Sequence, residues 1–524
     1  MPPDHSLVSA GTVWPQMTGS ANAGTLVDAN LDAGRESKAA LITADNRTVS
    51  YGELYSLVNR VAARLADFGV RREQRVLMIL DDTPAFPATF LGAMRIGAVP
   101  IPVNFLARQQ DFGYFLDDSY AVAAVVDAVF LGKVGPEVDK REHVRLIVAN
   151  GDAGDAESLD EWLAAGDMEV DPVMAHPDDM GFWLYSSGST GAPKGVVHRH
   201  GNLVATCEHY AKPTLGISDE DVTFSTTKMF HAYGLGNNLS FPLSVGATAV
   251  YSTGPPTPDK LLERVATHKP TLYFSVPALY AAVLAHTQFD ETDWSSVRLG
   301  ISAAEPLPPE TWRRFHARTG IEILDGLGST EMLHIYCSNR AGTVDPGSSG
   351  IAVDGYEVQI RDEEGSPVPE GEAGELWVRG PSTLSHYWHQ SRRTADKLTH
   401  GWFASGDRYH ENAKGNLVYE GRVDDMMKIS GLWVSPIEIE NRLMEHAAVH
   451  EAAVVGVEID YVSRIKASVI LAPGHEPSDE LVSELQQWCK DTLLRYQYPH
   501  VVEFVADFPR TATGKIQRFK LRAT

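Results

Sequence analysis

The sequence is poor in cysteine. Only three occur in 524 residues, Cys207, Cys337 and Cys489. An odd and widely spaced set is no disulfide framework, and no two of the three have the spacing of metal ligands. We therefore expect a protein of a reducing compartment, the cytoplasm.

The chain also lacks a long apolar run. Residues 1–20 contain no basic stretch followed by an apolar one, so no signal peptide is expected. The longest apolar stretch, 86–107, is interrupted by Arg95, Pro100 and Pro102. It is expected to form a buried helix and strand, and no membrane partner is predicted.

Positive charge is scarce. Lys and Arg number 45 against 69 Asp and Glu, which gives a formal net charge of −24. A surface this acidic repels nucleic acid and anionic lipid, so no nucleic-acid partner is expected. An anionic ligand would have to be held by local groups. The oligomeric state stays open, and a homodimer is compatible with the sequence.

What the chain does have is a run of glycines, hydroxyls and one lysine at 185–195, Tyr-Ser-Ser-Gly-Ser-Thr-Gly-Ala-Pro-Lys-Gly. Successive backbone N–H groups in such a loop form an anion-binding concavity. The run has neither the Gly-Lys-[Ser/Thr] ending of a Walker loop nor the dinucleotide fingerprint. A flexible surface loop is the alternative. The apolar flanks 180–185 and 196–198 instead predict two strands that mount a phosphate-binding loop.

The length exceeds what one core supports, so at least two domains are expected. Strands and helices alternate from residue 50 to about 340, which predicts an α/β domain with mostly parallel sheets. Alternating hairpin strands after Gly350 predict a small β-rich subdomain at about 350–424. The last hundred residues predict a small α+β unit. The expected division is 1–424 and 425–524, and the first ~30 residues are expected to form a loose arm.

Six further segments combine glycines or small residues with charged groups. Each has a simpler interpretation as a solvated loop, a turn, a surface ion pair or a basic tail. Their joint presence in this order makes the simpler interpretations improbable. The segments are 301–306, 324–331, 401–407, 421–425, 428–431 and 510–515.

Together these segments resemble the adenylate-forming superfamily of acyl-CoA synthetases, stand-alone adenylation domains and luciferases. The resemblance covers roughly residues 25–522. Within the superfamily the chain is most similar to bacterial benzoate–CoA ligases, through residues 229–237, 329–335 and 431–436.

The resemblance implies a nucleotide site for ATP. It assigns the phosphates to the glycine-rich loop and Thr330, Mg²⁺ to Glu331, the ribose to Asp407, and the ribose or phosphate to Arg422. Lys515 would bridge the attacking carboxylate and the α-phosphate, and His231 would lie beside the carboxylate path. The remaining implied ATP residues are Ser186, Ser187, Gly188, Ser189, Thr190, Gly191, Lys194, Ala304, Glu305 and Asp325.

The resemblance also implies a pocket for a small flat acid. Its walls would be Ala232, Tyr233, Gly328, His334 and Ile335, with Lys428 near the carboxylate in the thioester-forming state. The C-terminal domain would be mobile and would swivel at Asp424. One orientation presents Lys515, and the other presents Gly431 to form a tunnel for coenzyme A.

The expected activity is activation of benzoate or a related aryl acid as an acyl-adenylate. Transfer of the acyl group to coenzyme A would follow, with release of AMP and pyrophosphate. Two alternatives stay open: an enzyme that loads an aryl acid onto a carrier protein acting in trans, and an inactive nucleotide-binding protein. Ring-substituent tolerance is not decided by the sequence.

Overall fold

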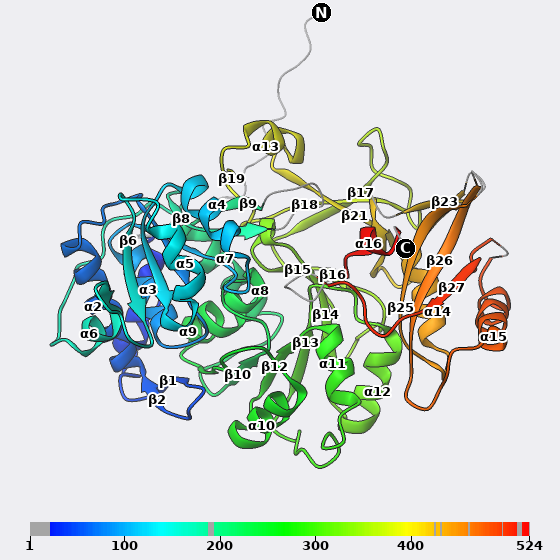
Figure 1. Cartoon of the computed structure of the whole chain (residues 1–524), viewed down its shortest axis with the longest axis horizontal. Coiled ribbons are helices and arrows are strands. Elements are labelled where there is room, and N and C mark those ends of the chain that lie inside the picture. The colour runs from blue at the N-terminus through cyan, green and yellow to red at the C-terminus, as the bar shows by residue number, and fades with distance from the viewer. Residues whose placement is uncertain are drawn as a thin grey trace, which may run out of the picture.

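The computed structural model describes residues 21–186, 193–423, 426–429, 432–459, 462–494, 496–510 and 516–522. Figure 1 shows a large body that carries the N-terminal and central parts of the chain, and a smaller body formed by its C-terminal part. This confirms the expected α/β architecture with a large N-terminal and a small C-terminal domain. No helix among the described residues is long and apolar enough to cross a membrane.

The first sheet has five parallel strands in the order β4-β3-β5-β6-β7. Side chains of β3 alternate between two cores: Val76 and Met78 pack with α2 and α3, whereas Leu77 and Ile79 pack with α4. Helices therefore cover both faces, as strand–helix alternation predicts. The bounds are β3 Arg75–Ile79, β4 Val99–Pro102, β5 Ala121–Asp127, β6 Arg145–Ala149, β7 Glu157–Ser158, α2 Tyr51–Asp67, α3 Ala85–Arg95, α4 Gln109–Ser119, α5 Leu131–Val138 and α6 Leu159–Ala164.

The second sheet has nine strands in the order β16-β15-β14-β13-β12-β10-β11-β1-β2. Strands β1 and β10 to β14 run parallel to one another. Strand β2 at one edge and strands β15 and β16 at the other edge pair antiparallel. The bounds are β1 Ala39–Ile42, β2 Thr48–Ser50, β10 Val222–Ser225, β11 Thr248–Val250, β12 Leu272–Ser275, β13 Leu299–Ser302, β14 Ile323–Gly328, β15 Ile335–Ser338, β16 Ile351–Ala352, α7 His200–Thr206, α8 Ala232–Leu235, α9 Phe241–Val245, α10 Pro258–His268, α11 Pro277–Leu284 and α12 Pro309–Thr319.

The expectation of a loose arm is wrong for residues 21–32. Asn22 and Val27 are buried, and α1 (Asp28–Asp32) is helical. A Cβ on Gly24 would lie 2.6 Å from the backbone nitrogen of Arg95, so the segment packs directly on α3. The small residues that suggested flexibility are here because they permit this close approach.

A three-stranded sheet carries the glycine-rich loop. Strands β8 (Met180–Ser186) and β9 (Lys194–Arg199) pair antiparallel on either side of the loop, as the apolar flanks predict. Strand β19 (His386–Tyr387), which is distant in sequence, pairs with β9. This pairing places His386 and Tyr387 beside the hairpin that carries the loop.

The rest of the chain forms smaller sheets. Strands β17, β18, β20, β21 and β22 make one antiparallel sheet, and β25, β26 and β27 make the sheet of the C-terminal domain. The bounds are β17 Glu357–Arg361, β18 Gly374–Arg379, α13 Ser391–Lys397, β20 Leu398–Thr399, β21 Trp402–Glu411, β22 Leu417–Arg422, β23 Met427–Ile429, β24 Leu432–Val434, α14 Pro436–Met444, β25 Val449–Ile459, β26 Val462–Leu471, α15 Asp479–Lys490, β27 Val501–Phe504 and α16 Arg518–Leu521.

Candidate active site

The strands on either side of the glycine-rich loop are paired with each other. Ser186 at the end of β8 lies opposite Lys194 at the start of β9, and the Tyr185 hydroxyl donates to Asp118 at 2.7 Å. The predicted phosphate contacts Ser187, Gly188, Ser189, Thr190 and Gly191 lie outside the described residues. Lys194 is half-buried, and burial lowers the pKa of its ammonium group. A cation that is partly desolvated is suited to meet an anionic ligand.

Tyr387 joins the loop to the turn that carries Glu331. Its hydroxyl donates to Glu331 Oε1 at 2.9 Å, and Lys194 Nζ lies 5.5 Å from the centre of its ring. The turn, Thr330–Met332, is capped by Ser329, whose hydroxyl accepts from the Met332 N–H at 3.2 Å. Sequence reasoning missed Tyr387, because only the pairing of β19 with β9 brings it here.

His198 makes a second connection between the loop hairpin and this turn. Its Nε2–H donates to the backbone oxygen of Thr330 at 2.8 Å, and its Nδ1 accepts from Asn202 at 2.8 Å. Burial lowers the pKa of His198 to about 4, so the ring is neutral at physiological pH. A neutral imidazole with one donor and one acceptor satisfies both partners. Sequence reasoning did not single out His198.

Asp407 and Arg422 face each other across two neighbouring strands. They are directly opposite in the β21–β22 register, and Arg422 Nη1 donates to Asp407 Oδ1 at 3.1 Å. Asp407 follows Gly406, whose φ of +76° favours glycine. The structure thus joins two predicted nucleotide contacts from separate motifs. Asp424, considered as a surface partner of Arg422, lies outside the described residues.

The predicted adenine contacts lie at the carboxyl ends of adjacent strands. Ser302 of β13 is opposite Asp325 of β14, and Ala304 and Glu305 follow β13. The Leu307 N–H donates to Asp325 Oδ2 at 3.2 Å, so this carboxyl supports the turn above it. Burial raises the pKa of Asp325 to about 7. Ala304 is exposed and Asp325 is buried, so Ala304 is the more accessible of the two.

The predicted acid contacts come together from two segments. Half-buried His231, Ala232 and Tyr233 begin α8. The Tyr233 hydroxyl donates to the Ile301 carbonyl at 3.1 Å, which fixes the ring. The ring centres of Tyr233 and His334 are 5.4 Å apart. For these five residues, Ala232, Tyr233, Gly328, His334 and Ile335, we keep the name of the predicted site, the acid pocket.

The second wall of the acid pocket is apolar and uncharged. Burial lowers the pKa of His334 to about 3, and its Nε2 lies 3.1 Å from Asn237 Oδ1, so the neutral ring donates there. A Cβ on Gly328 would lie 2.8 Å from the His334 backbone oxygen, which explains the glycine. Ile335 is buried behind it. Flat apolar surface of this kind suits an aromatic ring.

The C-terminal domain approaches the site from the adenine side. Arg510 and Glu440 both lie close enough to Glu305 for their charges to interact. The backbones of Arg510 and Ile516 pair in an antiparallel bridge. Lys515, Asp424 and Gly431 lie outside the described residues, as does the side chain of Lys428, whose backbone belongs to β23.

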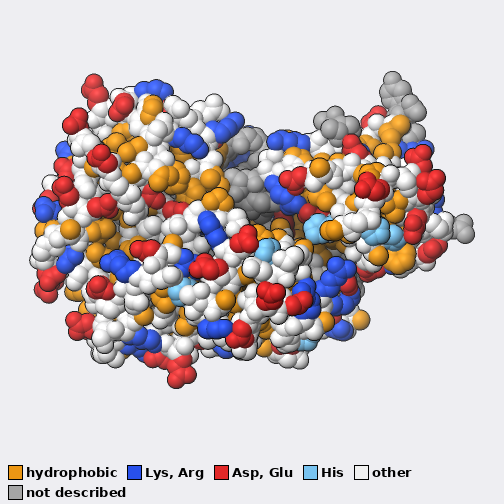
Figure 2. Space-filling view, turned by 60° about the horizontal axis from the view of Figure 1, so that its bottom comes forward, with side chains coloured by type: hydrophobic (Ala, Val, Ile, Leu, Met, Phe, Trp, Pro, Cys, Tyr) orange, Lys and Arg blue, Asp and Glu red, His pale blue; other side chains and the backbone are white. Residues whose placement is uncertain are grey.

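Acidic, basic and apolar side chains are interspersed over the face drawn in Figure 2.

Among the described residues, no group of three or more His, Cys, Asp or Glu side chains is arranged to hold a metal ion.

Comparison with known proteins agrees with this geometry. Residues 29–388 match the AMP-binding enzyme family, and residues 438–515 match the AMP-binding enzyme C-terminal domain. A benzoate–CoA ligase of Thauera aromatica is 46% identical over 99% of this chain and 98% of its own length.

Two solved structures are similar over nearly the whole chain. A benzoate CoA ligase from Burkholderia xenovorans LB400 superposes with a TM-score of 0.90 at 42% identity, covering 96% of this chain and 99% of the other. The anthranilate CoA ligase AuaEII in complex with anthranoyl-AMP gives a TM-score of 0.92 at 36% identity, covering 96% and 97%. The fold, the order of its motifs and these matches show that the chain belongs to the AMP-binding enzyme family.

Proposed function

We propose that the protein is an ATP-dependent ligase that activates benzoate or a related aryl acid and transfers the acyl group to coenzyme A. One observation carries the proposal. The short segment Gly328–Ile335 carries Glu331, which accepts from Tyr387, and His334, whose ring centre lies 5.4 Å from that of Tyr233. In this proposal Glu331 faces the nucleotide and His334 faces the acid, so one segment serves both sides, as attack of a carboxylate on the α-phosphate of ATP requires.

The chemistry needs a better leaving group on the acid. The carboxylate oxygen attacks the α-phosphorus and the bond to pyrophosphate breaks, which gives an acyl-adenylate. The thiolate sulfur of coenzyme A then attacks the acyl carbon, and AMP leaves. Catalysis of this kind rests on positioning and on neutralising charge. Lys194 and Lys515 would neutralise phosphate oxygens, and Asp407 would accept from the ribose hydroxyls.

Glu331 fits a magnesium site. It is half-buried at the foot of the loop hairpin, and one carboxylate oxygen accepts from Tyr387. Its second oxygen can serve as a ligand. Mg²⁺ typically takes one or two carboxylates, with waters and substrate phosphates completing its shell. When bound, the ion would neutralise charge on the phosphates.

The proposed two-orientation cycle gives the C-terminal domain two tasks. The charge interaction between Arg510 and Glu305 supports an orientation in which Arg510 lies on the nucleotide side. A rotation of the C-terminal domain at Asp424 would move Lys515 away from the nucleotide. The face of the domain that carries Gly431 and Lys428 would take its place. The proposed division at residue 424 lies two residues after Arg422, the last residue of β22.

ATP–pyrophosphate exchange tests the function. Benzoate and its ring-substituted relatives are expected to support exchange, and short aliphatic acids to fail. A second assay compares coenzyme A with a carrier protein as acceptor, and coenzyme A is expected to be the substrate. Background exchange with every acid would sink the enzyme proposal in favour of an inactive nucleotide-binding protein.

The cellular setting is part of the same proposal. All three cysteines are free and buried, which suits a cytoplasmic enzyme. Light scattering coupled to size-exclusion chromatography tests whether the protein forms the homodimer that the sequence allows.

A further inference from the structure

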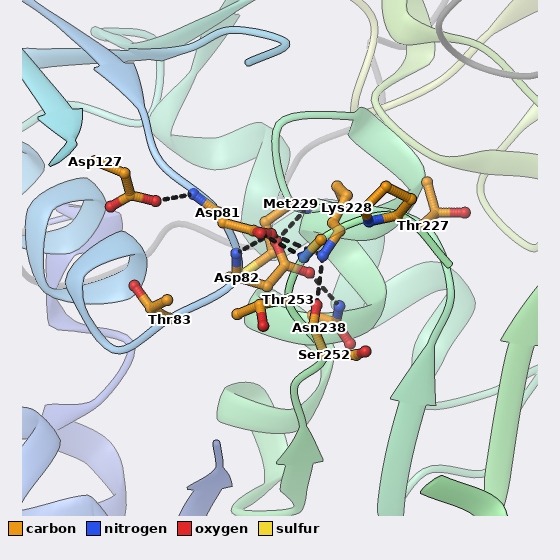
Figure 3. A network of polar contacts seen from close by, with 12 residues as sticks. Asp81, Asp82, Thr83, Asp127, Thr227, Lys228, Met229, Asn238, Ser252 and Thr253 are labelled. Carbon is orange, nitrogen blue, oxygen red and sulfur yellow. Dashed lines mark hydrogen bonds and ion pairs between the residues drawn. The ribbon is translucent and has the colours of Figure 1, made fainter. Parts of the chain in front are cut away.

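Three buried charged residues form a cluster beside the acid pocket. Asp81 and Asp82 follow β3 of the first sheet, and Lys228 follows β10 of the second (Figure 3). The side chains of Lys228 and Asp81 are only 10% and 12% exposed, and Asp82 is 2% exposed. The carboxyl ends of strands from both sheets therefore meet at this cluster.

Lys228 and Asp81 tie three strand ends together. Lys228 Nζ donates to Asp81 Oδ1 at 2.7 Å and also to the carbonyl of Ser252, which follows β11. Asp81 Oδ2 accepts from the Gly254 N–H at 2.6 Å. A buried ion pair adds little stability compared with apolar side chains of similar volume. Its value here lies in fixing the position of the chain around it.

The backbone of Lys228 sets the turn that carries His231 and Tyr233. The His231 N–H donates to the Lys228 carbonyl at 3.0 Å. A Cβ on Gly234 would lie 2.1 Å from that same oxygen, so the chain folds tightly against Lys228. A displacement of Lys228 would therefore also move His231 and Tyr233.

Asp82 fixes the opposite wall. Its Oδ1 accepts from the Met229 N–H at 3.1 Å, and its Oδ2 accepts from Asn238 at 3.3 Å. Asn238 lies in the π-helical turn Gly236–Ser240. In the same turn, Asn237 holds His334 at 3.1 Å. π-Helical turns are frequent at functional sites because they re-aim side chains.

We propose that Lys228, Asp81 and Asp82 are positioning residues for the carboxylic acid substrate. None of the three contacts the ring of Tyr233 or of His334 directly. They fix the two segments that carry these rings. Their loss is expected to weaken use of the acid and to leave use of ATP unchanged. The inference rests on the proposed function, because it needs an acid as the pocket's occupant.

The main test replaces both partners of the pair, Lys228→Met with Asp81→Asn, so that neither partner stays buried without the other. Asp82, whose charge also interacts with Lys228, is kept. In ATP–pyrophosphate exchange the KM for benzoate is expected to rise about tenfold or more, with the KM for ATP within about twofold, since the change is in ground-state acid binding. Arg95→Met with Asp28→Asn is the matched control: it removes a buried 2.8 Å ion pair between Arg95 of α3 and Asp28 of the N-terminal segment. Both KM values of that control are expected to stay at the wild-type level.

A gentler pair of variants keeps the proposal testable if the double variant does not fold. Asp82→Leu leaves the Met229 N–H and the Asn238 amide without their acceptor, and the KM for benzoate is expected to rise about threefold to tenfold. Asp82→Asn keeps an acceptor for Met229 and a donor for the Asn238 amide oxygen once that amide turns over, and is expected to keep the KM near wild type. If Asp82 contributed only to stability, its variants would lower the thermal midpoint of unfolding, and the KM for benzoate would not differ between them in this way.

The outcomes separate the two proposals. Wild-type protein that gives no exchange with any acid contradicts the proposed function. Active wild-type protein whose Lys228→Met/Asp81→Asn and Asp82→Leu variants keep an unchanged benzoate KM, or raise both KM values equally, overturns the positioning role.

Discussion

The hydroxyl of Tyr387 donates a 2.9 Å hydrogen bond to Oε1 of Glu331, although 56 positions separate the two residues. The contact fixes the carboxylate from the strand that also pairs with the loop hairpin. The proposed metal ligand is thereby oriented before any ion or nucleotide binds.

Glu331→Gln removes the charge of this group and keeps its shape. We expect ATP–pyrophosphate exchange to fall about a hundredfold or more, and half-saturation to need more Mg²⁺, because charge stabilisation of the phosphates is lost. Tyr387→Phe is the control, since the ring beneath Lys194 is retained. It is expected to cost about tenfold or less, which corresponds to about 1.4 kcal/mol. Equal losses in the two variants would argue against a metal-binding role.

His198→Phe should weaken use of ATP. The new ring keeps the stacking on Phe182, whose centre is 5.3 Å away, but it cannot donate to Thr330. We expect kcat/KM for ATP to fall by roughly tenfold in the exchange assay. His198→Gln retains an N–H donor and should lose less. Indistinguishable values for the two variants would show that the hydrogen bond does not matter.

Lys515→Ala should separate the two half-reactions. Synthesis from ATP and acid is expected to fall at least about a hundredfold, because an oxyanion contact formed in the transition state is removed. Conversion of supplied benzoyl-adenylate to the thioester should continue at nearly the wild-type rate. The measurement is thioester formation from each starting point, and parallel loss of both would contradict the two-orientation cycle.

Asp82→Asn should change how stability depends on pH. Burial raises the pKa of Asp82 to about 6 from an ordinary value of 3.8. Between these values the folded state holds the proton and the unfolded state releases it, so this group lowers stability as the pH rises. Relative to wild type, the variant is expected to gain up to about 3 kcal/mol between about pH 4 and pH 7.

Urea unfolding at the two pH values measures the difference. Asp127 serves as a reference, because burial raises its pKa to about 6 as well and Asp127→Asn should give a gain of the same sign. A difference between wild type and Asp82→Asn that stays constant with pH would mean that Asp82 does not titrate in this range.

Local patterns predicted the elements well. The Ser50–Glu53 pair, which has the spacing of a capping box, starts α2: the Glu53 N–H donates to Ser50 Oγ at 3.1 Å and the Ser50 N–H to Glu53 at 2.8 Å. The apolar run that follows Arg75 forms β3, Arg75–Ile79. Both depend on neighbours within a few residues, which a single sequence displays.

Contacts between distant segments were not predictable in the same way. The sequence marks Asp407 and Arg422 as separate motifs, but their pairing depends on the β21–β22 register. Lys228 and Asp81 meet because two different sheets place their strand ends together. Tyr387 lies in a two-residue strand with no helical or alternating pattern of its own. Sequence periodicity identifies strands and not their neighbours, so these three relationships required the structure.

Strand β1 pairs in parallel with β11, Leu41 opposite Ala249, and this has a consequence for biosynthesis. The ribosome releases β1 about 200 residues before its partner, which at about 5–20 residues per second is an interval of roughly 10–40 s. Until then β1 can pair only with β2, so its other edge and Leu41, which is only 1% exposed in the finished protein, lack the sheet that buries them. An apolar strand with an open edge invites aggregation. The nascent chain therefore passes through a stage in which a chaperone, rather than the fold, has to shield its first strand.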